Sequence, residues 1–429
     1  MLTNAEYRAD ESTLTSLDRE ARREVERERR AVLEAHCNYR LVDADQHYYE
    51  PDDCFTRHLE SQYRDQAVEI RRDGADGRGR IYLAGQRFRH LPGPPGESVA
   101  QPGVMREYFK SEARDVKKDY DGVVGAEIPE WSNRNARLRV LDQQQVEACL
   151  MLPTLGVLVE NECCRNVDAP VWYALMRSFN RWIEEDWGYG KDGRIFGVPL
   201  VSLFDPELAV VELERLLEAG AKVLLMRAGP VYGRSPADPV FDPFWARVQE
   251  AGVTVAFHIG DFGYLDWYAK EWGYGNEPFP VGAGDPFESI TCGNDRVMPD
   301  MIAALIFGNL CGRFPDLRFL SIELGASWLP GLLRKMDMIW RTPSRTRNKI
   351  DELPSDVYRR NFWITPYYED PWQDIIKAVG TSRVVLGSDW PHPEGLVEPL
   401  DLLEDIGIVS PEDLRLIMRD NTAGLLGIS

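Results

Sequence analysis

The sequence lacks the features that mark membrane, exported and disulfide-bonded proteins. No apolar run among its 429 residues approaches the length of about eighteen that a membrane span needs. The first residues, MLTNAEYRADEST, contain no basic stretch followed by an apolar one, so no export signal is predicted. The seven cysteines are an odd number and include no CxxC pair with zinc-site spacing. We therefore expect a soluble protein of the reducing cytoplasm, with no membrane partner.

Basic residues are also scarce relative to acidic ones. Fifty lysines and arginines stand against seventy aspartates and glutamates, which gives a formal net charge of −20. Such a charge repels a phosphate backbone, so we expect no nucleic-acid partner. An anionic small substrate would need arginines inside its pocket. With 44% hydrophobic and 28% charged residues, the composition is otherwise that of a globular protein with a large core.

The chain divides into a charged beginning and a long remainder. Residues 17–35 are rich in Arg and Glu and predict an exposed helix with ion pairs between successive turns, within an N-terminal extension over 1–39. RLVDADQH follows as an apolar run that ends in polar residues, which is typical of a strand that leads into a site. Residues 51–140 contain Gly and Pro clusters such as LPGPPGE and no sustained period. They predict an insertion, or lid, after the first strand.

From residue 145 onward, strand-like and helix-like segments alternate. Besides RLVDADQH, the strand candidates are QVEACLMLP, RIFGVPLVSL, AKVLLMRA, VTVAFHIG, LRFLSIEL, NFWITP and RVVLGSD. Helices are expected over VWYALMRSFNRWIEEDW and PELAVVELERLLEAG, and near 241–250, 299–312, 327–340 and 370–379. Several strands are apolar throughout, as strands covered on both faces are. No GxGxxG follows the first strand, which argues against a dinucleotide-binding sheet. The predicted fold class for 40–429 is α/β, a (β/α)8 TIM barrel.

Polar residues with metal-binding chemistry end four of the predicted strands. Asp45 and His47 end the first strand two residues apart, so their side chains leave the same side of an extended chain. The fifth, sixth and eighth strands end in His258, Glu323 and Asp389. In a barrel these ends meet at one mouth, where active sites are built. One such residue alone is more often a hydrogen-bonded structural group. Together they predict a centre for Zn²⁺, Mn²⁺ or Fe²⁺.

Motifs at these positions resemble the amidohydrolase superfamily. DADQH, FHIG, IELG and GSDWPHPEG, in this order along residues 40–429, are similar to its amidohydrolase-2 branch, typified by aminocarboxymuconate-semialdehyde decarboxylase. The resemblance implies a (β/α)8 barrel with one divalent metal bound by Asp45, His47, His258 and Asp389. The sequence departs from many relatives in having Asp45 and Glu323 where a histidine is common. Two carboxylate ligands roughly cancel the metal's charge, so bound water should be a weaker acid than in a three-histidine site.

The catalytic roles at this centre leave alternatives open. Asp389 is the expected base for metal-bound water or substrate. Three residues later, His392 is either a general acid, a hydrogen-bond donor to a metal ligand, or a residue that fixes the loop. Glu323 either binds the metal weakly, orients water or bonds His258.

Substrate-binding residues are predicted with similar alternatives. Arg227, in MRAGP at the end of the fourth strand, is either a clamp for a substrate carboxylate or an ion-pair partner inside the barrel. Many two-metal relatives have a lysine there, so Arg227 supports a centre with one metal. Trp390, Trp328 and Tyr367 are candidates for pocket walls, with core packing as the alternative.

Two enzyme activities fit this centre. The resemblance favours a non-oxidative decarboxylase of an aromatic or unsaturated carboxylic acid. The alternative is a hydrolase that directs metal-activated water at an ester, lactone, amide or carbon–carbon bond. A barrel that binds metal without catalysis is a third possibility. We expect zinc as the metal, with manganese or iron as alternatives, and a homodimer, since symmetric pairs are the commonest assemblies.

Overall fold

The computed structural model describes residues 37–88, 91, 93–110, 123–264, 267, 271–273, 296–342 and 350–428. The helix predicted over 17–35 lies outside these residues. No helix in the described part of the chain is long and apolar enough to cross a membrane.

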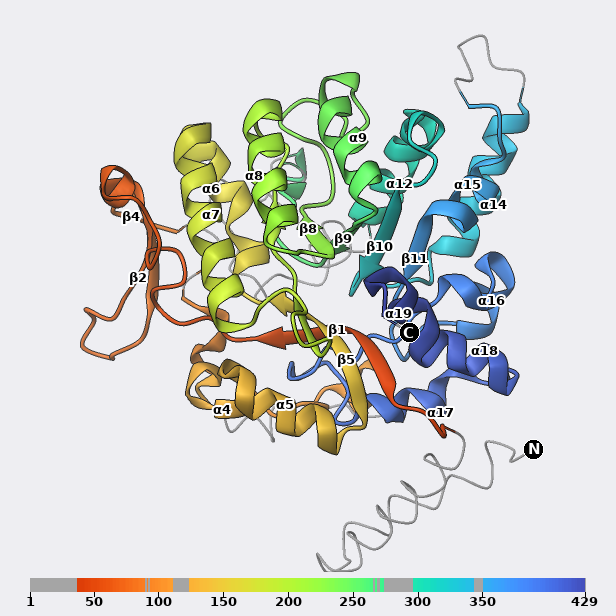
Figure 1. Ribbon diagram of the computed structural model, residues 1–429, viewed down its shortest axis with the longest axis horizontal. Helices are drawn as coiled ribbons and strands as arrows, with labels where there is room; N and C mark the ends of the chain where they lie inside the picture. The colour runs from red at the N-terminus through yellow and green to blue at the C-terminus, as the bar shows by residue number, and fades with distance from the viewer. Residues whose placement is uncertain are drawn as a thin grey trace, which may run out of the picture. The chain divides into compact units, whose positions relative to one another are not determined.

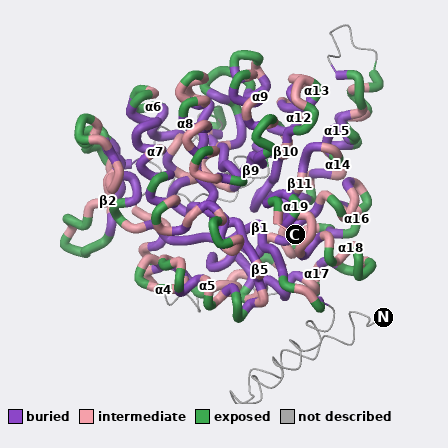
Figure 2. The backbone as a smooth tube through the Cα atoms, viewed as in Figure 1, coloured by how far each residue is buried: buried purple, intermediate pink, exposed green. Residues whose placement is uncertain are grey.

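Parallel strands around a buried centre form the framework of the molecule (Figure 1). They are β1 Leu41–Tyr48, β5 Val146–Pro153, β6 Ile195–Gly197, β7 Leu200–Val201, β8 Val223–Met226, β9 Thr254–His258, β10 Arg318–Ile322 and β11 Phe362–Ile364. One sheet has the order β1-β5-β6 and another the order β7-β8-β9-β10-β11, and every pairing in both is parallel. Almost all of these strand residues are buried, as Figure 2 shows, which explains why their sequences are apolar on both faces.

The third predicted strand, RIFGVPLVSL, is split into β6 and β7. Pro199 has no N–H to give to a neighbouring strand, and the regular pairing stops there. The connection persists across the break because Val198 N donates to Met151 O at 3.0 Å and Leu225 N donates to Pro199 O at 2.8 Å. Together, β6 and β7 therefore occupy the position of one strand in the ring.

The ring is closed by the eighth predicted strand, RVVLGSD, although it is not a regular strand. Residues 384–390 pair with β11 at Val384 and with β1 at Trp390. Between these points, Ala44 N donates to Leu386 O at 2.9 Å. Regular pairing is lost because the Asp43 carboxylate accepts the Ser388 N–H at 3.0 Å, in place of a backbone carbonyl of β1. The eight-strand prediction accounts for the whole ring.

Helices cover the outside of the strands. After β5 they are α6 Glu160–Asn166, α7 Ala169–Asp186, α8 Pro206–Glu218, α9 Asp242–Ala251, α12 Val297–Phe307, α13 Leu310–Arg313, α14 Leu329–Arg341, α15 Pro354–Asn361, α16 Trp372–Val379, α17 Leu403–Ile406, α18 Pro411–Arg415 and α19 Asn421–Leu426, with a π-helical turn over Leu416–Asp420. All six helices predicted after residue 145 are present, within a few residues of the expected bounds. Helices α6, α15 and those after residue 400 were not predicted.

The segment between β1 and β5 has more regular structure than its sequence predicts. It contains an antiparallel sheet of β2 Val68–Arg71, β3 Arg80–Leu83 and β4 Gln86–Arg87, and the helices α3 Arg106–Phe109, α4 Pro129–Ser132 and α5 Arg134–Gln143. These elements are mostly two to four residues long, too short to give the sequence a sustained period. Helix α5 escapes an apolar pattern search because one of its three buried residues is an arginine, Arg137.

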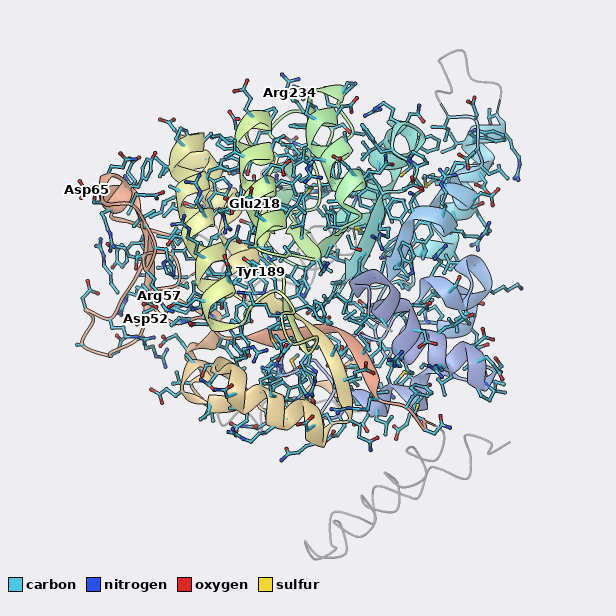
Figure 3. The ribbon with its side chains drawn as sticks, in the orientation of Figure 1. Asp52, Arg57, Asp65, Tyr189, Glu218 and Arg234 are labelled. Atoms are coloured by element: carbon cyan, nitrogen blue, oxygen red, sulfur yellow. The ribbon has the colours of Figure 1, made fainter. Side chains whose placement is uncertain are left out.

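This segment contacts the rest of the molecule at several places. Arg57 pairs with Asp186 of α7 at 3.0 Å, and within the segment an Arg72–Asp52 ion pair at 2.7 Å joins the antiparallel sheet to the chain just after β1; Figure 3 labels Asp52 and Arg57. Its second part lies on the loop that follows residue 390, where Met105 N donates to Pro393 O at 3.0 Å. The side chains of Tyr49, Val99, Trp131 and Trp390 form a buried apolar cluster at this contact.

Candidate metal centre

Two of the predicted site residues have unusual backbone conformations. Glu323 and Asp389 have φ values of 51° and 55°, in the left-handed region that costs an ordinary residue about 1–2 kcal/mol. Neighbouring groups fix both residues: Tyr367 Oη donates to Glu323 O at 2.8 Å, and Asp389 N donates to Asp45 O at 2.9 Å. This backbone conformation turns both carboxyl groups out of the line of their strands and toward the carboxyl end of the ring.

Four side chains form what we term the donor group: Asp45, His47, His258 and Glu323. All four are buried, and one donor atom of each lies within 4.8 Å of the others. His47 Nε2 lies 3.0 Å from His258 Nε2 and 3.2 Å from Asp45 Oδ1, and His258 Nε2 lies 2.9 Å from Glu323 Oε2. The first-strand pair, the fifth-strand histidine and the sixth-strand glutamate thus converge on one point.

Asp389 is close to the donor group and shares a second set of contacts. Asp389 Oδ1 lies 3.6 Å from His47 Nε2. It belongs to an overlapping group with His47, Glu323 and His392, which also satisfies the spacing for a metal. The structure therefore brings together all five strand-end residues that the sequence singled out. Glu323, which is outside the predicted ligand set, lies next to His258.

The donor group fits a divalent cation. Donors bound to one zinc ion at about 2.0–2.2 Å lie about 2.9–4.2 Å apart, which spans the distances found here. His258 Nδ1 lies 2.9 Å from Ile259 O, which can only accept, so Nδ1 carries a proton and Nε2 is the ring nitrogen that would give its lone pair to a cation. Glu323 Oε2 is buried, lies 2.9 Å from His258 Nε2, and accepts no hydrogen bond from any other described group. A cation at this point would satisfy both atoms.

The pKa shifts of these side chains also indicate that the site favours a positive charge. Burial alone would lower the pKa of His258, but the carboxylates of Glu323 and Asp45 outweigh it and raise that pKa well above its usual value. Burial raises the pKa of Asp389, and the nearby Glu323 carboxylate raises it further. For His47, burial and the neighbouring His392 lower the pKa, so this ring is neutral and available as a ligand.

His392 forms a hydrogen-bonded pair with Asp389. Its Nδ1 lies 2.6 Å from Asp389 Oδ1, and its Nε2 lies 3.1 Å from Thr154 Oγ1. The Thr154 hydroxyl donates to Tyr48 O at 2.7 Å, so it can only accept from His392, and Nε2 must carry the proton. The neutral ring then faces Asp389 with a lone pair. One proton is shared between these two side chains.

A second layer of buried polar residues supports the donor group. The Asp43 carboxylate accepts from Ser388 Oγ at 2.6 Å and from Gln46 Nε2 at 3.0 Å. Arg137, fully buried, donates to Gln46 Oε1 at 3.2 Å and to His47 O at 2.6 Å, and lies 4.3 Å over the Trp390 ring. Gln46 thereby joins a buried carboxylate to a buried guanidinium. The sequence analysis missed this layer because its members look like ordinary interior or surface residues.

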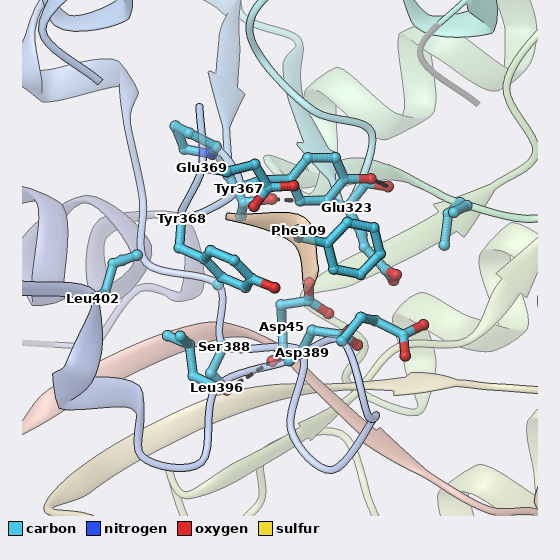
Figure 4. Close-up of a pocket in the computed structure, with 16 residues that line it drawn as sticks. Asp45, Phe109, Glu323, Tyr367, Tyr368, Glu369, Ser388, Asp389, Leu396 and Leu402 are labelled. Carbon is cyan, nitrogen blue, oxygen red and sulfur yellow. Dashed lines mark hydrogen bonds between the residues drawn. The ribbon is translucent and has the colours of Figure 1, made fainter. Parts of the chain in front are cut away.

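A cavity of about 250 Å³ opens above Asp45, Glu323 and Asp389 (Figure 4). The rings of Phe109 and Tyr368 face these carboxyl groups across it, and Tyr367, a predicted pocket wall, lines it as well. We use the term wall for four residues that line it on loops or short helices: Phe109, Tyr368, Glu369 and Glu394. None of these four was predicted.

The structure does not bring the other predicted substrate-binding residues into this cavity. Arg227 donates to Phe262 O and Pro230 O, both at 2.8 Å, and lies 3.9 Å from Glu160, which matches the ion-pair alternative rather than the clamp. Trp390 is 7% exposed and belongs to the buried cluster with Tyr49. Trp328 donates to Leu324 O and does not line the cavity. Trp390 thus follows the core-packing alternative, whereas Trp328 is half-buried and matches neither alternative.

Comparison with known proteins places these observations in a family. A ring of parallel strands with imidazole and carboxylate groups at the carboxyl ends defines an α/β-barrel class. The family model described as amidohydrolase matches residues 166–428. A crystal structure of an amidohydrolase from Mycobacterium avium subsp. paratuberculosis is 37% identical, with a TM-score of 0.83 over 91% of this chain and 99% of that one. The chain belongs to the amidohydrolase family.

Two more distant relatives have named activities. The 2-amino-3-carboxymuconate-6-semialdehyde decarboxylase of Dictyostelium discoideum is 22% identical over 238 residues, which are 55% of this chain. The match spans 62% of that curated relative. A dihydroxybenzoic acid decarboxylase from Polaromonas sp. JS666, solved with bound manganese and the inhibitor 2-nitroresorcinol, is 19% identical with a TM-score of 0.54, over 76% of this chain and 93% of that one. At this identity the likeness shows a shared fold.

Proposed function

We propose that the protein is a metal-dependent, non-oxidative decarboxylase of an aromatic or unsaturated carboxylic acid. The observation that carries this proposal is the convergence of two imidazoles and three carboxyl groups beneath a cavity lined by aromatic rings. The decarboxylase activities named for relatives in Dictyostelium and Polaromonas support it.

One divalent cation would be held by Asp45, His47 and His258, with Asp389 and Glu323 as further donors. Such a cation polarises a bound carboxylate and stabilises negative charge that develops on the substrate. Zinc fits the two imidazoles, whereas three carboxylates also suit manganese, the metal in the Polaromonas relative. Elemental analysis of the purified protein decides between them.

The chain's own residues supply the proton. Decarboxylation breaks the bond between the carboxyl carbon and the substrate carbon, releases CO₂, and leaves an electron pair that must take up a proton. Asp389 and His392 hold one proton between them, which rests on His392 Nδ1 when Asp389 is a ligand. Thr154 fixes the other ring nitrogen. Asp389 lines the cavity, and through Asp389 this pair would protonate the substrate carbon.

Hydrolysis is the second candidate, and one observation favours it. Apart from His258 Nε2 at 2.9 Å, the buried Glu323 Oε2 has no partner among the described residues, so it would be able to accept a hydrogen bond from water. Asp389 would then be the base that takes the proton of that water. The Glu323→Gln variant sorts these roles: loss of activity with full metal content assigns Glu323 to water positioning or proton transfer.

Isotope incorporation separates the candidate activities. In D₂O, decarboxylation puts one deuterium on the carbon that loses CO₂, whereas hydrolysis adds one water across the cleaved bond. A screen of aromatic and unsaturated acids, with CO₂ recorded and products analysed by mass spectrometry, measures both. Cleavage products without CO₂ would favour the hydrolase. Metal-replete protein without any turnover would favour the non-catalytic barrel.

We further propose that residues 51–140 act as the lid predicted from the sequence, supported by the placement of Phe109 on the cavity and by the Met105–Pro393 hydrogen bond. The N-terminal extension over 1–39, a homodimer and a cytoplasmic location stay predictions. Light scattering of the purified protein tests the dimer.

A further inference from the structure

The pairing of β1 with β5 is followed by side-chain hydrogen bonds where the two strands end. Tyr48 and Pro153 are the last paired residues. The residue after them on the β5 side, Thr154, donates its hydroxyl proton to Tyr48 O at 2.7 Å. The same hydroxyl oxygen lies 3.1 Å from Nε2 of His392, which is 238 positions further along the chain. One buried hydroxyl group therefore connects the end of β1 with the His392 ring.

Glu50 fixes the backbone that follows Thr154. Its Oε1 accepts from Leu155 N at 2.8 Å and from Gly156 N at 3.1 Å, and the residue is only 7% exposed. An oxygen of this side chain thus takes the place that a carbonyl of a neighbouring strand would have for both N–H groups. The carboxyl group keeps an accepting oxygen whether it is ionised or neutral, so the contact does not depend on its charge.

The far end of the same turn is held by the loop that follows β9. Asp261 N donates to Val157 O at 3.2 Å. A Cβ atom added to Gly260 would lie 2.5 Å from that oxygen, so the two loops are in close contact. Residues 154–157 are therefore held on both sides, by Glu50 and by the loop after β9. The hydroxyl group at the start of this turn has a set position.

The His392 ring depends on such contacts because it lies on an irregular loop. Its Nδ1 lies 2.6 Å from Asp389 Oδ1, and its centroid lies 4.1 Å from that of the His47 ring. Thr154 is the hydrogen-bond partner at the other ring nitrogen. A ring bonded at both nitrogens keeps one orientation, whereas loss of the Thr154 contact would let it turn away from Asp389.

Resting on the proposed function, we infer that Glu50 is a positioning residue for the proton transfer, and that it acts through Thr154 on the orientation of His392. Glu50 is not among the residues that line the cavity. Its effect on the reaction therefore passes through the His392–Asp389 pair.

A double-mutant cycle tests this inference. Glu50→Leu should lower kcat by about 10 to 100-fold at nearly unchanged KM and metal content, because the turn loses its acceptor. Thr154→Val keeps the shape of the side chain, loses the hydroxyl group and should lower kcat by a similar factor. Glu50→Gln keeps an accepting oxygen and should retain most of the activity. In a His392→Asn background, Glu50→Leu and Thr154→Val should each cost less than about twofold, because the residue they act on is gone.

Thr422→Val is the matched control for Thr154→Val. Thr422 is also buried, and its hydroxyl has no hydrogen-bond partner among the described residues, so this variant should keep the wild-type kcat. An undiminished loss from Glu50→Leu in the His392→Asn background would overturn the inference, since a purely structural role predicts that result. If Glu50→Leu does not fold, the same comparison with Thr154→Val decides, because Thr154 stands between Glu50 and His392.

The orientation of the ring also has a readout that needs no turnover. In ¹⁵N-histidine spectra of the zinc-loaded full-length protein, the Nε2–H signal of His392 is the one that disappears in His392→Asn. Its exchange with solvent should become about tenfold faster or more in Thr154→Val and Glu50→Leu. Unchanged exchange in both variants would overturn the inference whatever the activity. If exchange changes as expected but no acid releases CO₂, the proposed function fails while the positioning by Glu50 holds.

Discussion

The donor group and the wall enclose the same cavity but are built differently. Asp45, His47 and His258 lie on regular strands, and all members of the donor group are at most 7% exposed. In the wall, Phe109 is 39% exposed and Glu369 is also exposed, and all four residues lie outside regular strands. The chemical centre thus depends on the ring of strands, whereas the surfaces that meet the rest of the substrate depend on loops. Substitutions should therefore separate reaction from selection.

The largest expected effect is the loss of kcat on substitution of Asp389. Asp389→Asn should lower kcat by about 10² to 10⁴-fold or more, because the amide keeps the shape but cannot hold the shared proton. Asparagine also tolerates the left-handed backbone that Asp389 has, so the fold should survive. Steady-state kinetics with metal analysis on the same sample checks this. An Asn variant with wild-type kcat and unchanged metal content would refute the role of Asp389.

The second layer of buried polar residues, which supports the donor group, should control the stability of the protein. Arg137→Met should lower the free energy of unfolding by about 3 to 5 kcal/mol, because His47 O and Gln46 Oε1 lose a charged donor inside the protein. Arg139→Met is the control, since Arg139 lies on the same helix but is exposed. Denaturant titration measures both variants. Similar stabilities would show that the buried guanidinium contributes nothing beyond its surface counterpart.

A pH titration of stability probes the end of β1. Burial raises the pKa of Glu50 from 4.5 to about 7, opposed by hydrogen bonds from Leu155 N and Gly156 N. A raised folded-state pKa means that stability is complete below about pH 4.5 and is lost as pH rises through 7. The loss from this group is about 3 kcal/mol.

Glu50→Gln should therefore reduce the loss of unfolding free energy between pH 4.5 and 8. It should not abolish it, because burial also raises the pKa of Asp43 to about 7. The exposed Glu127→Gln serves as the reference. An unchanged pH slope in Glu50→Gln would mean that Glu50 does not hold its proton in this range.

The smallest effect is expected in the wall. Phe109→Ala should raise KM by less than about tenfold and change the free energy of unfolding by about 0.5 kcal/mol or less, since the side chain is partly exposed. Metal content should stay the same. A loss of metal in this variant would contradict the separation between wall and donor group.

The strands and their polar ends could be predicted because both follow local rules. Continuous apolar runs mark strands buried on both faces, and residues such as His47 and His258 stand out where such runs end. Even the irregular last strand was located, because its residues are buried like those of a regular strand.

The wall and the supporting layer depend on contacts that no local pattern records. Phe109 reaches the cavity only because α3 is held on α17 through Asp405, almost 300 positions away. Arg137 reads as a surface residue until the Trp390 ring covers it. Arg227 was correctly placed at a strand end, but its partner Glu160 lies on α6, which the sequence did not predict.

The closure of the ring has a consequence for synthesis. β1 is among the first described segments, and its partner at residues 384–390 is among the last, so the Ala44–Leu386 hydrogen bond joins nearly opposite ends of the barrel sequence. A nascent chain on the ribosome holds β1 and β11 as two open edges until those residues emerge, and such edges invite pairing with other chains. Asp389 arrives in the same stretch, so a growing polypeptide completes its candidate set of metal ligands only when its barrel can close.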